Sequence, residues 1–483
     1  MTDEMNFSFR PNRSEPNPEC VERFPGDFLK TWLGRALLLI LFLAFVVRVA
    51  GAFYWEVKIA GRDAQHVSDG PFYFADSDSY WKLGRAVAFG RPYQFDEERR
   101  WTVFRMPGYP MLLAPFFYIH GEYPPVLSAR ILNCCLGTCS VALIAMLTWV
   151  LFKSQIIALV AAAIAAFDPC LIVESVTVLS EEPFQVALLL QMIILVLILK
   201  ELPECVGTAS RTVRRRRCSQ AIALGMLSAL TVLFRPSWLY FAPFVMMIVL
   251  LATVYRFGLC GRFFYVVRTS LVAIAVFCLC MMPWWLRNAM VTGTFVPTTL
   301  QMGASLYDGL SPTATGASDM AFVDSFREQL GPVAGSVSEQ GKFERRLDEI
   351  MKKAALDWSW NHPREVLRLA GVKFARLWNF IPNEPGFQSW PIRLALIVSY
   401  TPVLVLGLWG FVCLCRKRGE IWLLAMPAVY LTLLHIIFVS SLRYRTPAMP
   451  MFMILAAWTL VMLWKTHRGQ PSHRVNNKGN EIQ

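Results

Sequence analysis

About ten long apolar runs divide this chain, and they restrict its fold more than any other feature of the sequence. The first run, 32–54, has about 20 residues, enough to cross ~30 Å of hydrocarbon as a helix. The later runs lie near 125–151, 155–168, 183–200, 219–234, 237–254, 270–286, 392–415, 420–439 and 447–464. Because lipid offers no partners to backbone N–H and C=O groups, these runs predict an all-α, polytopic membrane protein.

The composition agrees with this class. Of the 483 residues, 55% are hydrophobic and 17% are charged, whereas soluble domains are nearer ~45–50% apolar. A secretory signal has an apolar core of only ~7–15 residues, so we expect 32–54 to remain as an uncleaved first span. The 12 cysteines show no metal-binding spacing, and buried, reduced thiols are the expectation for most of them.

Four clusters of basic residues predict the orientation of the chain, because Lys and Arg concentrate in short loops that stay in the cytoplasm. The clusters are Arg211 with Arg214 to Arg217, then Arg256 with Arg262 and Arg268, then Arg416 to Arg418, and lastly Lys465 with Arg468. They account for much of the net charge of +13. No aromatic interleaving or binding fold accompanies them, so we expect no nucleic-acid partner.

This orientation predicts five parts of the chain. They are a cytoplasmic tail at 1–31, a transmembrane module at 32–286 with its first outer loop at 55–124, an extracytoplasmic loop domain at 287–391, transmembrane helices at 392–465 and a cytoplasmic tail at 466–483. The count requires that Pro107–His120, about 14 residues, dips into the membrane and returns, or lies along its interface, rather than crossing.

The large outer segment has two halves of different character. Thr292–Gly341 is rich in Gly, Ser, Thr and Pro, which predicts irregular loop. Lys342–Trp358 is predicted to form a charged helix, and Pro363–Phe380 an amphipathic one. The second helix has an apolar stripe opposite basic residues, so it could lie in the membrane interface or pack over the spans.

The first outer loop carries the candidate catalytic residues, Asp76 and Asp78. They open a segment that is apolar at helical spacing and ends at Gly90, which places both carboxylates at a helix N-terminus. Acidic residues there are commonly caps. The Asp-x-Asp spacing is also that of a metal site for nucleotide-sugars, although no nucleotide-binding domain accompanies it.

Isolated arginines on the same predicted side are candidates for binding a phosphate. They are Arg105, Arg235, Arg287, Arg443 and Arg445, and Glu181 adds a carboxylate. A single arginine at the end of a span is usually a membrane anchor, whereas several near a carboxylate could hold an anionic phosphate by paired hydrogen bonds. The carboxylate could then take a proton from a hydroxyl acceptor while the arginines stabilise a phosphate leaving group, without a metal.

Several short motifs occur along the chain in an order that resembles that of a known family. They are Asp76-Ser77-Asp78-Ser79-Tyr80-Trp81-Lys82-Leu83-Gly84-Arg85, Arg105-Met106-Pro107-Gly108-Tyr109-Pro110, Leu179-Ser180-Glu181, Pro283-Trp284-Trp285-Leu286-Arg287-Asn288, and Arg443-Tyr444-Arg445-Thr446-Pro447 with Pro450. Over about 75–465 the chain resembles the bacterial branch of the GT-C membrane glycosyltransferases, which is similar to dolichyl-phosphate-mannose protein mannosyltransferases and lipid A aminoarabinose transferases.

The resemblance implies a GT-C-like bundle of about 10–12 transmembrane helices in the cell inner (plasma) membrane. It implies an inverting hexosyl or pentosyl transferase that moves a sugar from a polyprenyl-phosphate donor to a protein, lipid or glycan acceptor on the extracytoplasmic face. Neither a cofactor nor a metal is expected.

The resemblance also implies roles for single residues. Asp76, four residues before Tyr80, matches the family's catalytic base, with Asp78 in reserve because the family often has Asp-Glu where this chain has Asp76-Ser77. Arg105 stands where close relatives carry a Lys-Pro-Pro and could take the cationic role. Glu181, Tyr80 and Tyr109 are expected to orient the acceptor or the base, and Glu181 could instead be a helix cap.

Two other classes of protein remain as alternatives. A transporter or lipid flippase would carry its ionisable groups near the bilayer midplane, on broken helices in repeated halves, whereas here they lie at span ends and no repeat is visible. A non-catalytic scaffold subunit would need no acidic pair beside a phosphate site.

Overall fold

The computed structural model describes residues 31–60, 72, 74–95, 100–202, 210–333, 335–381 and 389–468. Most of these residues are helical, and the part of the chain described here contains no β-strand beyond an isolated bridge between Phe95 and Trp101. The predicted all-α fold is confirmed. The predicted tails at 1–31 and 466–483 lie almost entirely outside the described residues.

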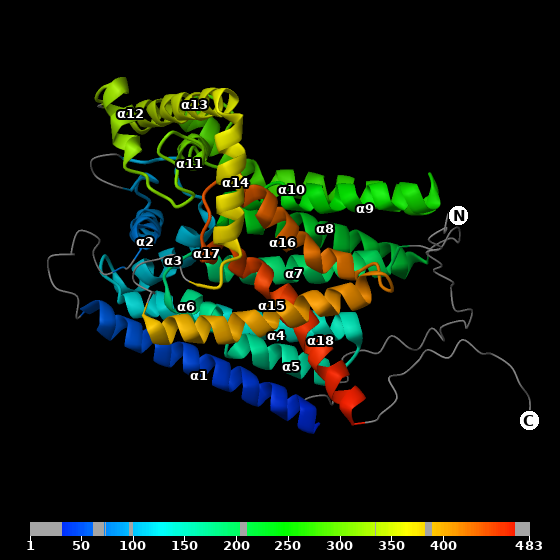
Figure 1. Ribbon diagram of the computed structural model, residues 1–483. Helices are drawn as coiled ribbons and strands as arrows, with labels where there is room; N and C mark the ends of the chain where they lie inside the picture. The colour runs from blue at the N-terminus through cyan, green and yellow to red at the C-terminus, as the bar shows by residue number, and fades with distance from the viewer. Residues whose placement is uncertain are drawn as a thin grey trace, which may run out of the picture.

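Long apolar helices run side by side and form the body of the molecule (Figure 1). Among the described residues eight stretches are long and apolar enough to cross a membrane, or nine if one bent pair is a single span. The long helices are α1 (Trp32–Ala60), α4 (Val126–Phe152), α7 (Glu181–Lys200), α8 (Arg211–Phe234), α9 (Phe241–Phe257), α10 (Gly261–Thr292), α15 (Trp390–Cys415) and α18 (Met449–His467). The bent pair is α5 (Gln155–Ala166) with α6 (Pro169–Val176), and α16 (Ile421–His435) is apolar but shorter. Each predicted run therefore corresponds to a helix.

A buried arginine stabilises the bend between α5 and α6, which is 58°. Arg48 of α1 is fully buried and donates to the carbonyl groups of Ala165 and Ala166, which end α5. Asp168 accepts from the backbone N–H of Leu171 and caps α6. Helix ends need such partners because their last carbonyls and first N–H groups have none within the helix. After the bend, the chain continues through α6 to the start of α7.

Helices α8 and α10 approach each other closely at Gly225. A Cβ atom there would lie 2.5 Å from the carbonyl oxygen of Ala273 and 2.8 Å from Cβ of Val276. Small residues allow this spacing between membrane helices, whose association depends on close packing.

We expect Gly225→Ala to lower the midpoint of thermal unfolding in detergent, because overpacking against backbone costs about 1–3 kcal/mol. Gly371→Ala is the matched control, since a Cβ there meets nothing within 4 Å. Midpoints that change equally in the two variants would contradict the close approach of α8 and α10.

A second group of helices, most of them short, gathers at one end of the bundle (Figure 1). They are α2 (Ala75–Ala88), α3 (Gly108–His120), α11 (Met302–Gly309), α12 (Phe322–Leu330), α13 (Val337–Asn361), α14 (Pro363–Leu377) and α17 (Leu442–Arg445). The 13 residues of α3 are too few to cross ~30 Å of hydrocarbon, in agreement with the prediction for 107–120. The predicted boundary at 287 falls within α10, which continues to Thr292.

The prediction of irregular loop over Thr292–Gly341 is wrong in three places, because α11 and α12 lie within it and α13 begins at Val337, five residues before the predicted Lys342. In α12 the apolar residues Phe322, Phe326 and Leu330 recur at helical spacing. They pack on a cluster that includes Trp101 from the segment between α2 and α3 and Phe343 from α13. Packing against these distant residues stabilises helices that are too short to be stable alone.

The predicted helix at Pro363–Phe380 is α14, and one of its faces packs on the protein. Leu369, Lys373 and Leu377 are buried, and Lys373 donates to the carbonyl of Ile437 at 2.6 Å. Leu367 on another face is 75% exposed. The packing role is therefore confirmed for one face, and contact of the other face with the membrane interface stays a prediction.

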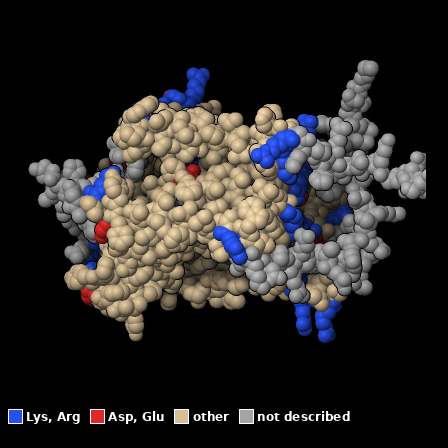
Figure 2. Space-filling view, turned by 90° about the horizontal axis from the view of Figure 1, so that it is seen from below, with Lys and Arg blue, Asp and Glu red and all other residues tan. Residues whose placement is uncertain are grey.

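Basic side chains gather toward the end of the bundle opposite α2 and α3, as Figure 2 shows. The basic clusters predicted to be cytoplasmic stand at the start of α8, the start of α10, the end of α15 and the end of α18. The short helices and the basic clusters thus occupy opposite ends of the molecule.

Candidate active site

Asp76 lies between two arginines that come from distant parts of the chain. It stands in the first turn of α2, as predicted. One carboxylate oxygen accepts a hydrogen bond from Arg105, in the segment before α3, and the other accepts from Arg443 of α17 at 2.8 Å. The Asp76 side chain keeps 30% of its surface exposed. The carboxylate is therefore held in place yet open to a second molecule.

Arg443 also joins Asp76 to a second carboxylate. Its Nε forms an ion pair with Glu181, in the first turn of α7, and the Glu181 side chain is only 2% exposed. Arg235, at the C-cap of α8, lies 3.8 Å from the same carboxylate. A guanidinium has five N–H donors, and the two carboxylates occupy only some of those on the three arginines. The remainder could bind a phosphate.

The arginines change the acidity of Asp76. Burial disfavours its charge, but Arg105 and Arg443 outweigh burial and hold the pKa of the carboxyl well below its usual range. Asp76 is therefore ionised at neutral pH. It is also a weak base for as long as both guanidinium groups hold it.

Aromatic rings line the arginine cluster. The ring of Tyr444 lies 5.8 Å from the guanidinium carbons of both Arg235 and Arg443. The imidazole of His435 stacks on Tyr444 with ring centroids 4.5 Å apart, and Phe184 lies 5.6 Å from Arg235. Such rings fix the guanidinium planes and add favourable cation–π contact. Tyr444 and Phe184 were not singled out from the sequence, although Tyr444 stands between two predicted arginines.

Tyr80 and Tyr109 are buried behind the cluster. The Tyr80 hydroxyl lies 3.3 Å from that of Ser180, the residue before Glu181. The two tyrosine rings meet edge to face with centroids 5.3 Å apart, and Tyr109 donates to the side chain of Asn133. They connect α2 and α3 to the segment that leads into α7. Their predicted part in orienting the base is compatible with this position.

Three other predicted residues do not join the cluster. Asp78 pairs with Lys82 on α2 at 2.7 Å. Arg287 donates to the carbonyl of Tyr93 at 3.4 Å and lies over its ring. Arg445 is 3% exposed and donates to the carbonyl of Leu377. Within the described residues none of the three forms an ion pair with Asp76 or Glu181.

Helix geometry explains part of this difference. Arg443 and Arg445 are two residues apart on a helix, so their side chains diverge by about 200° and cannot face one site. The Asp-x-Asp pair separates because Asp76 pairs with the arginines while Asp78 pairs with Lys82. In the described part of the chain, no group of three or more His, Cys, Asp or Glu is arranged to hold a metal ion.

Sequence reasoning missed a third carboxylate. Glu174 of α6 is 7% exposed. Glu181 and Arg235 lie close enough to act on it electrostatically. A single acidic residue within the apolar stretch 169–176 was the available signal, because a carboxylate at membrane depth is costly to bury and commonly functional.

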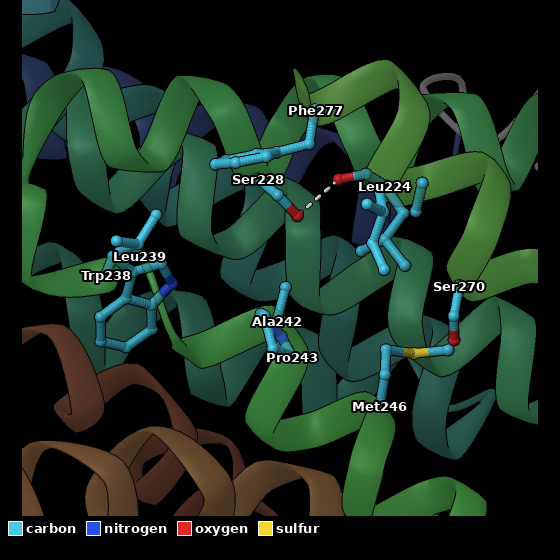
Figure 3. A pocket seen from close by; sticks show the side chains of 11 residues that line it. Leu224, Ser228, Trp238, Leu239, Ala242, Pro243, Met246, Ser270 and Phe277 are labelled. Atoms are coloured by element: carbon cyan, nitrogen blue, oxygen red, sulfur yellow. Dashed lines mark hydrogen bonds between the residues drawn. The ribbon is translucent and has the colours of Figure 1, made fainter. Parts of the chain in front are cut away.

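An apolar pocket lies between α8, α9 and α10 (Figure 3). It is open to the surface and is lined from α8, α9, α10 and the short helix η3 (Pro236–Trp238) by Leu224, Ser228, Trp238, Leu239, Ala242, Pro243, Met246, Ser270, Ala273, Ile274 and Phe277. Trp238 connects the pocket to the arginine cluster, because its backbone N–H donates a hydrogen bond to the carbonyl of Arg235 at 3.0 Å. Its ring also contacts Phe184 edge to face.

A family of membrane mannosyltransferases matches part of the chain. The family, described as dolichyl-phosphate-mannose-protein mannosyltransferase, matches residues 114–296. This segment contains Glu181 and Arg235, whereas Asp76, Arg105 and Arg443 lie outside it. The match confirms over this segment the resemblance that the ordered motifs indicated. No curated protein matches the chain.

The structure is similar to that of an archaeal oligosaccharyltransferase, AglB from Archaeoglobus fulgidus. In complex with an inhibitory peptide and a dolichol-phosphate, AglB gives a TM-score of 0.58 at 14% identity, covering 94% of this chain and 53% of that one. The apo form of the A. fulgidus enzyme gives 0.55 at 12% identity, with coverages of 94% and 53%. The chain therefore spans about half the length of these relatives. At such identity the likeness shows the fold, which is GT-C-like as predicted.

ArnT from Cupriavidus metallidurans, bound to undecaprenyl phosphate, also matches. Its TM-score is 0.39 at 13% identity, with 89% of this chain and 78% of that chain covered.

Proposed function

We propose that this protein is an integral membrane glycosyltransferase that moves a sugar from a polyprenyl-phosphate donor to a protein, lipid or glycan acceptor. The observation that carries the proposal is the partly exposed carboxylate of Asp76 between Arg105 and Arg443. A base for the acceptor hydroxyl thus stands beside a binding site for the leaving phosphate. The matching mannosyltransferase family and the fold shared with an oligosaccharyltransferase support it.

The reaction follows from this geometry. The acceptor oxygen attacks the anomeric carbon, its proton passes to Asp76, and the bond from the anomeric carbon to the phosphate oxygen breaks. The oxygen leaves with the electron pair, and Arg443, Arg105 and Arg235 stabilise its charge. A single displacement inverts the anomeric configuration. Because donor phosphate competes with Asp76 for the same guanidinium groups, binding of the donor makes Asp76 more basic.

The apolar pocket beside Arg235 suits the lipid part of the donor. Its lining is almost wholly hydrophobic, and two of its residues, Trp238 and Leu239, follow Arg235 by three and four positions. An isoprenoid chain in this pocket would leave its phosphate near the cluster. The A. fulgidus oligosaccharyltransferase has been solved with a dolichol-phosphate, which is a lipid of this class.

On this proposal the cluster faces the extracytoplasmic side of the cell inner (plasma) membrane. The basic clusters at the opposite end of the bundle support that orientation, because Lys and Arg are retained on the cytoplasmic side.

The test is transfer of label from radiolabelled polyprenyl-phosphate sugars to endogenous acceptors in membranes that contain the protein. Membranes without the protein are the control. Transfer above the control supports the proposal and identifies the sugar. If no donor of a panel gives transfer while a labelled lipid or solute crosses the membrane, the protein is a transporter. If neither occurs, the result favours a non-catalytic scaffold subunit.

We expect transfer to be independent of divalent cations, because the three arginines of the cluster supply the positive charge that a metal would provide. Rates measured with and without excess chelator should agree. A loss of transfer that added Mg²⁺, Mn²⁺ or Ca²⁺ restores would contradict this expectation.

A further inference from the structure

The segment that carries Arg105 is attached to the outer helix α13 by one buried carboxylate, Glu344. This side chain is 1% exposed. It accepts hydrogen bonds from the backbone N–H of Thr102, from the Thr102 hydroxyl at 2.6 Å, and from the backbone N–H of Val103 at 3.0 Å. The two residues that it holds stand three and two positions before Arg105.

Such a contact is specific because a buried carboxylate is costly without partners. Both carboxylate oxygens of Glu344 accept hydrogen bonds from three donors of a single loop segment. Displacing that segment would therefore leave an unpaired charge in the interior. Trp101, one residue earlier, packs in the same apolar cluster as Phe343 of α13. The attachment therefore combines hydrogen bonds with apolar contact.

Two further contacts fix the backbone between this attachment and Arg105. The carbonyl of Val103 accepts from the backbone N–H of Leu300 at 2.9 Å, and Val103 is fully buried. Beyond it, the Tyr93 hydroxyl donates to the carbonyls of Arg105 and Met106 at 3.3 and 3.1 Å. The backbone on either side of Arg105 is thus fixed, and its guanidinium reaches Asp76 and, at 3.2 Å, the hydroxyl of Ser79.

We propose that Glu344 is a positioning residue: it holds the segment 102–105 so that the Arg105 guanidinium meets Asp76 and the donor phosphate. The inference rests on the proposed function. It assigns a part in the reaction to the extracytoplasmic loop domain. Its helix α13 supplies neither Asp76 nor Arg105, but it aligns the two.

The acidity of Glu344 gives this attachment a pH dependence. Burial raises the pKa of Glu344 to about 7, although the donors on Thr102 and Val103 and the charge of Arg287 on α10 act to lower it. Arg327 of α12 also stands near, 5.2 Å from the ring of Phe343. A raised pKa means that the buried, attached state holds the proton more tightly than a solvent-exposed carboxyl does. The ionised form therefore favours opening of the segment, and the attachment weakens as pH rises through about 7.

The first experiment measures access to the attached segment and needs no activity. Val103→Cys is introduced into purified, detergent-solubilised protein, and the rate of its modification by a maleimide is read by mass spectrometry of the peptide. We expect Glu344→Gln to raise that rate about 10-fold or more, because local opening exposes the thiol. Glu349→Gln, on the same helix but 63% exposed, is the control. Equal rates in the two variants would overturn the proposal.

The second experiment measures transfer as a function of pH. We expect the turnover number of the wild type to fall as pH rises through about 7, and that of Glu344→Gln to be lower below this pH and to lack the fall. Thr102→Val, which removes only the hydroxyl donor, should show a smaller defect and keeps the test valid if Glu344→Gln does not fold. An unchanged turnover number and pH profile would show that Glu344 positions nothing of catalytic use. A wild type without transfer would contradict the proposed function, while the labelling rates would still decide the attachment.

Discussion

Asp76→Asn is expected to lower the turnover number for sugar transfer by about 10²–10⁴-fold, the range of a lost general base. The Michaelis constant for the donor should stay the same or fall. Asparagine carries no charge, so Arg105 and Arg443, which now pair with Asp76, would be free to bind the donor phosphate. The measurement is steady-state transfer with the polyprenyl-phosphate sugar that the wild type uses, at matched expression.

Asp78→Asn is the matched control for this variant. Asp78 lies two residues away on the same helix and pairs with Lys82, so its loss should change transfer less than about 3-fold, in keeping with a partly exposed ion pair. If Asp78→Asn abolishes transfer and Asp76→Asn does not, the base is Asp78. If neither changes the rate, the site is elsewhere.

Arg443→Met is expected to have two separate effects. Loss of its guanidinium should reduce the turnover number by about 10²–10³-fold, as for other groups that stabilise a developing negative charge. It also leaves Glu181, which is 2% exposed, with only the more distant Arg235 at 3.8 Å, and removing one partner of a buried ion pair costs about 3 kcal/mol. We therefore expect a lower midpoint of thermal unfolding together with the loss of transfer.

The double variant Arg443→Met/Glu181→Gln separates the two effects. Neutralising both partners of a buried pair is far less damaging than removing one of them, so the midpoint should recover most of its loss. Transfer should not recover, because the phosphate still lacks Arg443. Transfer restored together with stability would mean that Arg443 only holds Glu181. Transfer retained in Arg443→Met alone would contradict its role.

The sequence predicts the helices well because each apolar run has one dominant solution in lipid, a helix that satisfies its own backbone. The start of α2 was predicted from Asp76 and the end of the same segment from Gly90, since both are local signals. The helices α11 and α12 were missed because they depend on packing with Trp101 and α13, which the local sequence does not reveal.

The candidate site was predicted in part for a similar reason. Asp76, Arg105, Arg443, Glu181 and Arg235 do converge, although they come from four separate regions of the chain. Sequence position alone does not give the direction of a side chain, so Arg445 was grouped with Arg443 although helix geometry turns it away.

Glu344 could not be found from the sequence at all. It is one acidic residue among several in a charged helix, and only the arrangement of the segment between α2 and α3 against α13 shows that it is buried.

The most direct test of the central claim is whether the purified protein recognises the phosphate of a polyprenyl phosphate. The midpoint of thermal unfolding is measured in detergent with increasing polyprenyl monophosphate and, separately, with the polyprenol of equal length. We expect the monophosphate to raise the midpoint of the wild type, because a ligand at 100 times its dissociation constant stabilises the folded protein by about 2.7 kcal/mol. The polyprenol should have a much smaller effect. The double variant Arg443→Met/Glu181→Gln should lose that difference. Equal shifts from both lipids, or an undiminished phosphate effect in the double variant, would contradict a phosphate site in the arginine cluster.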